Sequence, residues 1–274
     1  LSALEKETTD RYIEQTLLAA IIAEKYGVGL VTLWLPDGSN YPGQMELSES
    51  IRATRLSLSR ISEALSKKVK LLLEYKVFEP GTYSTVLPDW GSAYLMAKDF
   101  GANAGVLVDL GHHFHSANIE QIVARLIDDG MWGGFHFNTR YAADDDHSVE
   151  PNPEMARIFY ELIVGEVVCN DNHERNWAYM IDQCSGRENR LHAILHSIDS
   201  LQMSLAKAAL VDREKLVQLQ KEDEIILANR FFNNALINAD VRPIVAKARL
   251  ENKLPIDPVA AYVNSGYQQK IETE

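Results

Sequence analysis

The apolar positions along the chain alternate between the three- and four-residue spacing of helices and short, continuously apolar runs. Residues 4–26 repeat apolar side chains at helical spacing, which predicts an amphipathic helix. The next run, residues 30–35, is apolar and partly β-branched and ends at Pro-Asp-Gly, which predicts a strand. The same alternation then continues along the chain. Further helices are predicted over residues 47–65, 90–100, 119–127 and 153–168, and further strands over residues 69–76, 104–110, 133–138 and 177–182.

Five strands separated by helices indicate parallel βαβ units, and strands that are apolar throughout indicate a sheet covered on both faces. After Asp182 the alternation stops, and residues 188–261 are predicted to be helical, with prolines as punctuation. We therefore expect an α/β portion over residues 1–186 and a helical extension over residues 187–274.

Composition and charge narrow the classes of partner. Lys and Arg number 27 against 39 Asp and Glu, so the net charge is −12, which disfavours binding to nucleic-acid phosphates. The longest apolar run, residues 17–23, is too short to span a bilayer, so no membrane partner is expected. Two cysteines make no disulfide framework and no signal peptide is recognisable, so we expect a cytoplasmic protein with a small-molecule partner. Because the chain opens inside a predicted helix without an initiator Met, we also expect a fragment.

Polar side chains stand at the carboxyl ends of the predicted strands. In a (β/α)8 barrel these ends form the rim on which active sites are built, and in a doubly wound sheet they line the ligand crevice. In either fold the polar side chains converge. They are Glu74 and Lys76 on the second strand, Asp109 and His112 on the third, His136 on the fourth and Asp182 on the fifth.

Carboxylates gathered in a half-buried pocket repel one another unless a positive charge intervenes, and one lysine is not sufficient. Oxygen ligands with a minority of imidazoles suit Mg²⁺, Mn²⁺ or Co²⁺ better than Zn²⁺. Asp144 and Asp146, alternate members of an acidic triplet, can chelate a second ion. We therefore predict two metal sites that share Asp109: Glu74, Asp109, His136 and Asp182 for one ion, and Asp109, His112, Asp144 and Asp146 for the other.

Each feature also has a plainer interpretation. A lone Asp182 is often a helix cap, an acidic triplet is often a solvated loop, and His113 and His115 are explained by packing and capping alone. Trp34 is either a pocket wall or core, and Lys76 either holds a substrate oxygen or balances the acids. Chance alone is a poor explanation for ionisable groups at four successive strand ends. Their joint occurrence therefore favours a metal site.

Several motifs together resemble L-rhamnose isomerases, specifically the bacterial subtype with broad aldose specificity in the xylose isomerase-like superfamily. The residues are 34–44 (WLPDGSNYPGQ), 74–76 (EYK), 108–112 (VDLGH), 135–138 (FHFN), 144–146 (DDD) and 180–183 (MIDQ). The resemblance implies a (β/α)8 TIM barrel that lacks its first three strands here, followed by a C-terminal helical arm. It also implies a homotetramer assembled through that arm.

The resemblance further implies two divalent cations per subunit, with Mn²⁺ favoured and Co²⁺, Mg²⁺ or Zn²⁺ as alternatives. The His136 set would hold a structural ion and the His112 set a catalytic one. Trp34, Lys76 and His112 would bind the sugar, while Lys76, His112 and Asp146 would act in catalysis. The expected enzyme is an intramolecular oxidoreductase that converts L-rhamnose and related aldoses to ketoses by a 1,2-hydride shift, although an enediol route also fits the residues.

Other functions remain open at this stage. Sugar 3-epimerases of the same superfamily use one metal and two glutamates, and Glu74 fits one of these. Endonucleases share the fold, but the net charge of −12 disfavours them. A third alternative is an inactive fragment that only binds metal, because the His that relatives place on their third strand is missing from this sequence.

Overall fold

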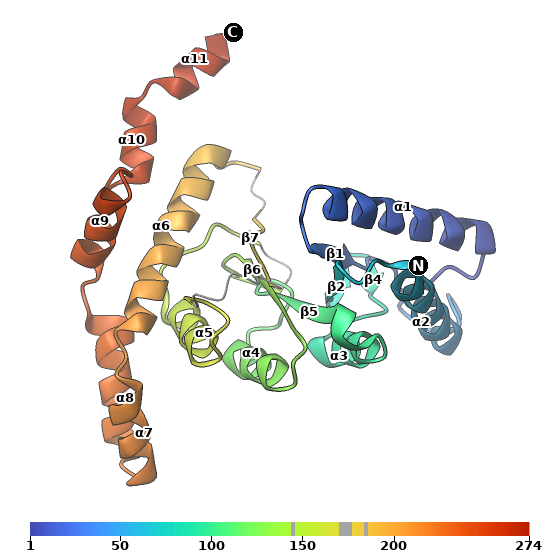
Figure 1. The fold of residues 1–274 in the computed structure, drawn as a ribbon, viewed down its shortest axis with the longest axis horizontal. Helices are drawn as coiled ribbons and strands as arrows, with labels where there is room; N and C mark the ends of the chain where they lie inside the picture. The colour runs from blue at the N-terminus through green and yellow to red at the C-terminus, as the bar shows by residue number, and fades with distance from the viewer. Residues whose placement is uncertain (80, 144–145, 170–176, 184–185, 274) are drawn as a thin grey trace. The chain divides into compact units, whose positions relative to one another are not determined.

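The computed structural model describes residues 1–79, 81–143, 146–169, 177–183 and 186–273 (Figure 1). The chain divides into two compact units. The first comprises Leu1–Asp146 with Asp171–Asp182, and the second comprises His147–Asn170 with Gln183–Glu274.

The first unit is built on a parallel five-stranded sheet with the order β1-β2-β5-β6-β7. This half-barrel sheet confirms the predicted α/β fold with an incomplete barrel, and β1 and β7 form its two edges in the part of the chain that is described. The strands are β1 (Leu30–Trp34), β2 (Lys70–Glu74), β5 (Ala104–Asp109), β6 (Trp132–Phe137) and β7 (Ala178–Ile181), and the helices of this unit are α1 (Lys6–Lys25), α2 (Leu47–Ala64), α3 (Trp90–Lys98), the 3-10 turn η1 (Gly101–Asn103) and α4 (Ile119–Asp128).

The central strands carry the core. Every residue of β5 and β6 is buried, and so are four of the five residues of β2, as expected for strands covered on both faces. Gly134 on β6 has a φ of 143°, and a Cβ there would overlap the backbone of Ala178 on β7. This glycine therefore lets β6 and β7 approach closely enough to pair.

Helix α1 forms where its periodicity predicted, but most of its large apolar side chains are exposed. Ile13, Ala20 and Ala23 are buried, whereas Leu18 and Ile21 are 57% and 63% exposed. Small side chains allow the helix to lie close to α2 and β1, which it contacts. The spacing of apolar residues thus identified the helix without identifying its packed face.

A hairpin between β2 and α3 was not predicted. Its strands, β3 (Phe78–Glu79) and β4 (Tyr83–Ser84), are two residues long, too short for an alternating pattern. The loop after β1 pairs with this hairpin through a bridge between Gly38 and Thr85. The hairpin therefore fixes the loop that follows Trp34 beside the loop that follows Glu74.

The second unit is helical, as the sequence predicted for the residues after β7. Helix α5 packs along α6, and α9 and α10 also contact α6 (Figure 1). No described helix is both long and apolar enough to cross a bilayer. Cys169 is an exposed thiol, and Cys184 lies outside the described residues. The helices are α5 (Pro153–Val164), α6 (Arg190–Ala209), α7 (Arg213–Lys221), α8 (Ile225–Asn233), the π-helical turn η2 (Asn234–Asn238), α9 (Arg242–Glu251), α10 (Pro258–Asn264) and α11 (Tyr267–Thr273).

Candidate metal centre

The carboxyl edge of the sheet brings four of the predicted ligands together. Asp109 pairs with His136 in the register of β5 and β6, and Glu74 and Asp182 stand at the ends of the flanking β2 and β7. Nδ1 of His136 lies 3.1 Å from Oε1 of Glu74, 3.3 Å from Oδ2 of Asp109 and 3.5 Å from Oδ2 of Asp182. Each residue offers a ligand atom within 4.8 Å of the others. We refer to Glu74, Asp109, His136 and Asp182 as the His136 cluster.

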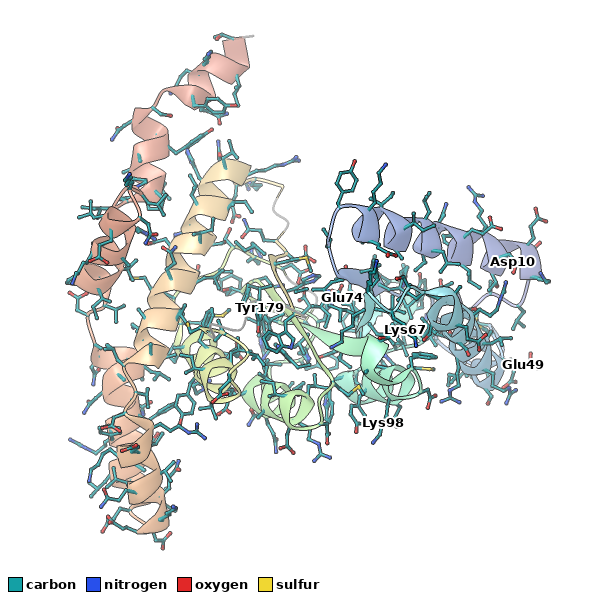
Figure 2. The ribbon with its side chains drawn as sticks, in the orientation of Figure 1. Asp10, Glu49, Lys67, Glu74, Lys98 and Tyr179 are labelled. Atoms are coloured by element: carbon teal, nitrogen blue, oxygen red, sulfur yellow. The ribbon has the colours of Figure 1, made fainter. Side chains whose placement is uncertain are left out.

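Glu74 differs from the acidic residues on the helices in how deeply its side chain is buried. Glu74 lies among the strands and is 5% exposed, whereas Glu49 on α2 is exposed and lies on the outside of the unit (Figure 2). A polar group this deeply buried is costly unless a cation or hydrogen bonds compensate for the lost water.

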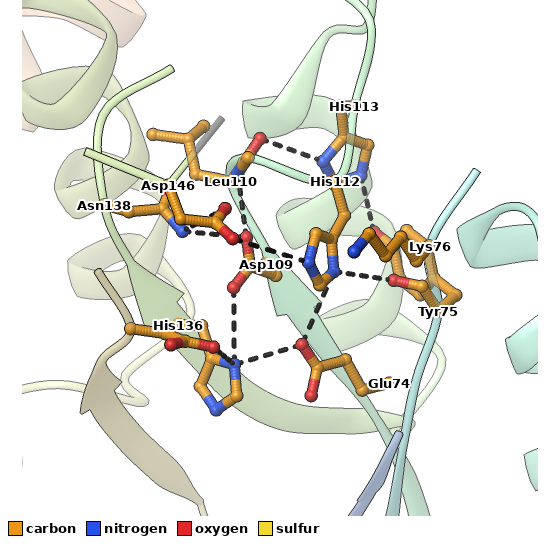
Figure 3. A network of polar contacts seen from close by, with 12 residues as sticks. Glu74, Tyr75, Lys76, Asp109, Leu110, His112, His113, His136, Asn138 and Asp146 are labelled. Atoms are coloured by element: carbon orange, nitrogen blue, oxygen red, sulfur yellow. Dashed lines mark hydrogen bonds and ion pairs between the residues drawn. The ribbon is translucent and has the colours of Figure 1, made fainter. Parts of the chain in front are cut away.

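Asp109, His112 and Asp146 make a second group with ligand atoms within 4.8 Å of one another, which we refer to as the His112 cluster. Nδ1 of His112 donates to the carbonyl oxygen of Tyr75 at 2.9 Å, because a carbonyl can only accept. Nε2 is left facing Asp146, 4.0 Å from its Oδ2 (Figure 3). A backbone contact that fixes the tautomer is typical of histidines that bind metals. Asp144, the fourth predicted ligand, lies outside the described residues.

The His136 cluster places several carboxylates around one imidazole, so its charge balance depends on the protonation of His136. Burial alone would lower the pKa of His136, but its contacts with Asp109 and Glu74 outweigh burial and raise the pKa to about 10. A proton on this imidazole therefore supplies the positive charge between the carboxylates. Oδ2 of Asp109 is buried and accepts no well-formed hydrogen bond from the described residues. An acceptor left in this state beside two further carboxylates and an imidazole fits a divalent cation.

Trp34 and Lys76 come together beside these clusters. Nζ of Lys76 lies 5.2 Å from the centre of the Trp34 ring and 3.5 Å from the carboxylate of Glu79 on β3. Trp34 is 40% exposed, so it is not a core residue. The ammonium group of Lys76 thus lies against the indole ring and pairs with Glu79.

His113 and His115 match the packing interpretation. His113 is buried, its Nε2 lies 2.6 Å from the hydroxyl of Tyr75, and burial lowers its pKa to about 4. The exposed His115 donates from Nε2 to the carbonyl of Tyr141 at 2.7 Å. Both histidines hold loops in place.

Sequence reasoning gave no role to Asn138 or Gly111. The backbone N–H of Gly111 and Nδ2 of Asn138 both donate to Oδ1 of Asp109 at 2.8 Å. Asn138 lies two residues after His136, and that spacing along an extended segment was the available signal. Gly111 could be found only from the structure, because a Cβ there would overlap the carboxylate of Asp146.

Comparison with known proteins gives relatives in sequence and in structure. A scan against models of protein families found no match. Over the whole chain, the sequence is 37% identical to a probable sugar isomerase of Rhizobium meliloti (strain 1021) and 36% identical to one of Mesorhizobium japonicum (strain LMG 29417 / CECT 9101 / MAFF 303099). The chain spans 64% of the length of each.

Solved structures share the fold at low sequence identity. A D-tagatose 3-epimerase-like protein has a TM-score of 0.58 and 18% identity, covering 78% of this chain and 74% of that one. An L-ribulose 3-epimerase has a TM-score of 0.57 and 16% identity, covering 77% and 74%. In sequence the chain is thus similar to probable sugar isomerases, and in fold it is a partial TIM barrel similar to sugar 3-epimerases.

Proposed function

We propose that this chain forms the metal-binding part of a sugar isomerase that interconverts an aldose and its ketose, with L-rhamnose and L-rhamnulose as the candidate pair. The observation that carries the proposal is the pair of clusters at the strand ends, which share Asp109. Similarity to two probable sugar isomerases supports the reaction class. The choice of L-rhamnose rests on the motifs in the sequence.

The His136 cluster would hold one divalent cation, and the His112 cluster, completed by Asp144, would hold the other. Mn²⁺ is the first candidate, with Co²⁺, Mg²⁺ and Zn²⁺ as alternatives. When bound, such ions supply Lewis acidity that polarises substrate oxygens and lowers the pKa of a hydroxyl group.

Each side chain around the clusters would act on a different part of a bound open-chain aldose. Trp34 forms a wall beside the sugar, and Lys76 donates a hydrogen bond to O1. Asp146 accepts the proton of the O2 hydroxyl, while His112, held by the Tyr75 carbonyl, keeps its Nε2 directed toward Asp146. The C2–H bond then breaks, the hydrogen moves to C1 with its electron pair, C2 becomes the carbonyl, and O1 receives a proton.

Epimerisation at C3 is the second candidate. It is favoured by the two structural neighbours, an L-ribulose 3-epimerase and a D-tagatose 3-epimerase-like protein. The two reactions differ in the fate of hydrogen, because proton removal at C3 exchanges with solvent whereas a hydride shift retains the hydrogen. Turnover in D₂O therefore separates them: deuterium appears at C3 of an epimerised product and is absent from a hydride-shifted one.

The deciding experiment measures conversion of L-rhamnose to L-rhamnulose by the chain after treatment with EDTA and again after addition of Mn²⁺. We expect activity that Mn²⁺ restores and that Asp109→Ala abolishes. Asp128→Ala, an exposed acid at the end of α4, is the matched control and keeps its activity. Activity that survives EDTA, or no turnover of any aldose with Mn²⁺ bound, would contradict the proposal.

We also propose a homotetramer that assembles through the C-terminal helices, as the sequence resemblance implies. Exposed apolar side chains on these helices support it. They include Ile194 and Ile198 on α6, Ile225 and Ile226 on α8, and Ile244 and Leu250 on α9. Sedimentation equilibrium tests it, and a monomer at all concentrations would contradict it.

A further inference from the structure

A buried side-chain amide, that of Asn138, connects the His136 cluster and the His112 cluster. Asn138, which follows β6, is fully buried, and its Nδ2 donates to Oδ1 of Asp109 at 2.8 Å and to Oδ1 of Asp146 at 3.2 Å (Figure 3). The opposite amide orientation would direct an oxygen at two carboxylates, so the assignment follows from charge. Its own Oδ1 is buried and accepts no hydrogen bond from the described residues.

These hydrogen bonds decide which oxygen of each carboxylate is directed at which cluster. With Oδ1 of Asp109 accepting from both Asn138 and Gly111, it is Oδ2 that lies 3.3 Å from Nδ1 of His136. With Oδ1 of Asp146 directed at the amide, it is Oδ2 that lies 4.0 Å from Nε2 of His112. One NH₂ group therefore holds Oδ1 of both acids, which leaves Oδ2 of Asp109 near His136 and Oδ2 of Asp146 near His112.

The geometry points to Asn138 as a positioning residue that directs Oδ2 of the shared Asp109 at His136 and Oδ2 of Asp146 at His112. This inference rests on the proposed function only in that the clusters bind divalent cations. It does not require that the chain convert any sugar.

The two acids depend on Asn138 to different degrees. Asp109 is completely buried at the end of β5 and keeps the N–H of Gly111 when the amide is removed. Asp146 lies outside any strand, and its side chain is 23% exposed. Loss of the amide should therefore weaken the His112 cluster selectively, and the His136 cluster serves as an internal control in the same molecule.

The test is a Mn²⁺ titration of the full chain by calorimetry and electron paramagnetic resonance, comparing wild type with Asn138→Ala and Asn138→Leu. Leucine fills the buried volume without a donor, so it keeps the test valid if the alanine variant folds poorly. We expect one ion to bind at least about tenfold more weakly and the other to change by less than about threefold, because loss of a partner that orients a ligand costs about 10–100-fold in affinity. Asn118→Ala, which removes the cap of α4, is the matched control and leaves both affinities unchanged.

Two outcomes of the titration would overturn the inference: unchanged affinities in both variants, or equal weakening of both ions, which would show a general structural role. A wild-type chain that binds two ions without turning over sugar would contradict the proposed function alone. A wild-type chain that binds no Mn²⁺ would overturn both. Hydrogen exchange of the Asn138 side-chain NH₂, followed by NMR in the metal-free chain, provides a separate readout: slow exchange supports the bridge, and unprotected exchange overturns it.

Discussion

The protonated His136 makes the stability of the metal-free chain depend on pH. Its pKa is about 10 in the folded chain against a usual value of 6.5, because contacts with Asp109 and Glu74 outweigh the effect of burial. A pKa raised by folding stabilises the folded state fully below the unfolded value, and that contribution is lost as the pH rises through the folded value. At 1.36 kcal/mol per pH unit, the interval from 6.5 to about 10 corresponds to at most about 5 kcal/mol.

Urea unfolding in EDTA at about pH 6, 8 and 10 measures this contribution. We expect the free energy of unfolding of the wild-type chain to fall by a few kcal/mol across this range, and we expect His136→Gln to lose most of that fall. His196→Gln, which removes an exposed histidine of α6, is the matched control and keeps the wild-type profile. Identical profiles for wild type and His136→Gln would refute the charge balance described for the cluster.

The same proton competes with a divalent cation, because the cation binds the neutral imidazole. The apparent affinity of the His136 cluster for Mn²⁺ should therefore rise by up to about tenfold per pH unit between 6.5 and about 10, with one proton released per ion bound. Calorimetry in buffers of different ionisation enthalpy counts these protons. An affinity independent of pH would show that His136 is not protonated in the metal-free chain.

Three substitutions separate effects on the site from effects on the fold. Gly111→Ala displaces the carboxylate of Asp146, so Mn²⁺ binding by calorimetry should weaken about tenfold while urea unfolding changes by less than about 1 kcal/mol. Gly134→Ala forces a Cβ into the backbone of Ala178 at a φ of 143°, so urea unfolding should show a loss of at least about 3 kcal/mol. Arg249→Met removes a buried guanidinium that pairs with a carboxylate of α6 at 2.6 Å, so unfolding of the second unit should lose about 3–5 kcal/mol while Mn²⁺ affinity is unchanged.

The order of elements and the gathering of the ligands were predictable because they depend on local period and on one topological rule. A strand rich in apolar residues and a helix of ordinary length can be recognised within a dozen residues. Parallel strands joined by helices place their carboxyl ends at one edge, so Glu74, Asp109, His136 and Asp182 had to meet. The two-residue strands β3 and β4 were missed because a segment that short has no period.

The face by which α1 packs could not be predicted from the spacing of its apolar residues. Its spacing of apolar residues fits several faces, and the one chosen carries Ala20 and Ala23 rather than the bulkier Leu18 and Ile21. Close approach to α2 and β1 decides this, and it depends on the shapes of segments distant in sequence.

The sequence by itself determined a parallel α/β sheet, a helical C-terminal portion and a set of acids and histidines at the strand ends. Only the tertiary structure decided that Nε2 of His112 faces Asp146, that Nδ1 of His136 faces three carboxylates, and that Asn138 holds two acids at once. The physical reason is that a ligand's chemical type is a property of one residue. Which of its atoms would face a bound cation is set by hydrogen bonds from loops that the chain brings together from far apart in sequence.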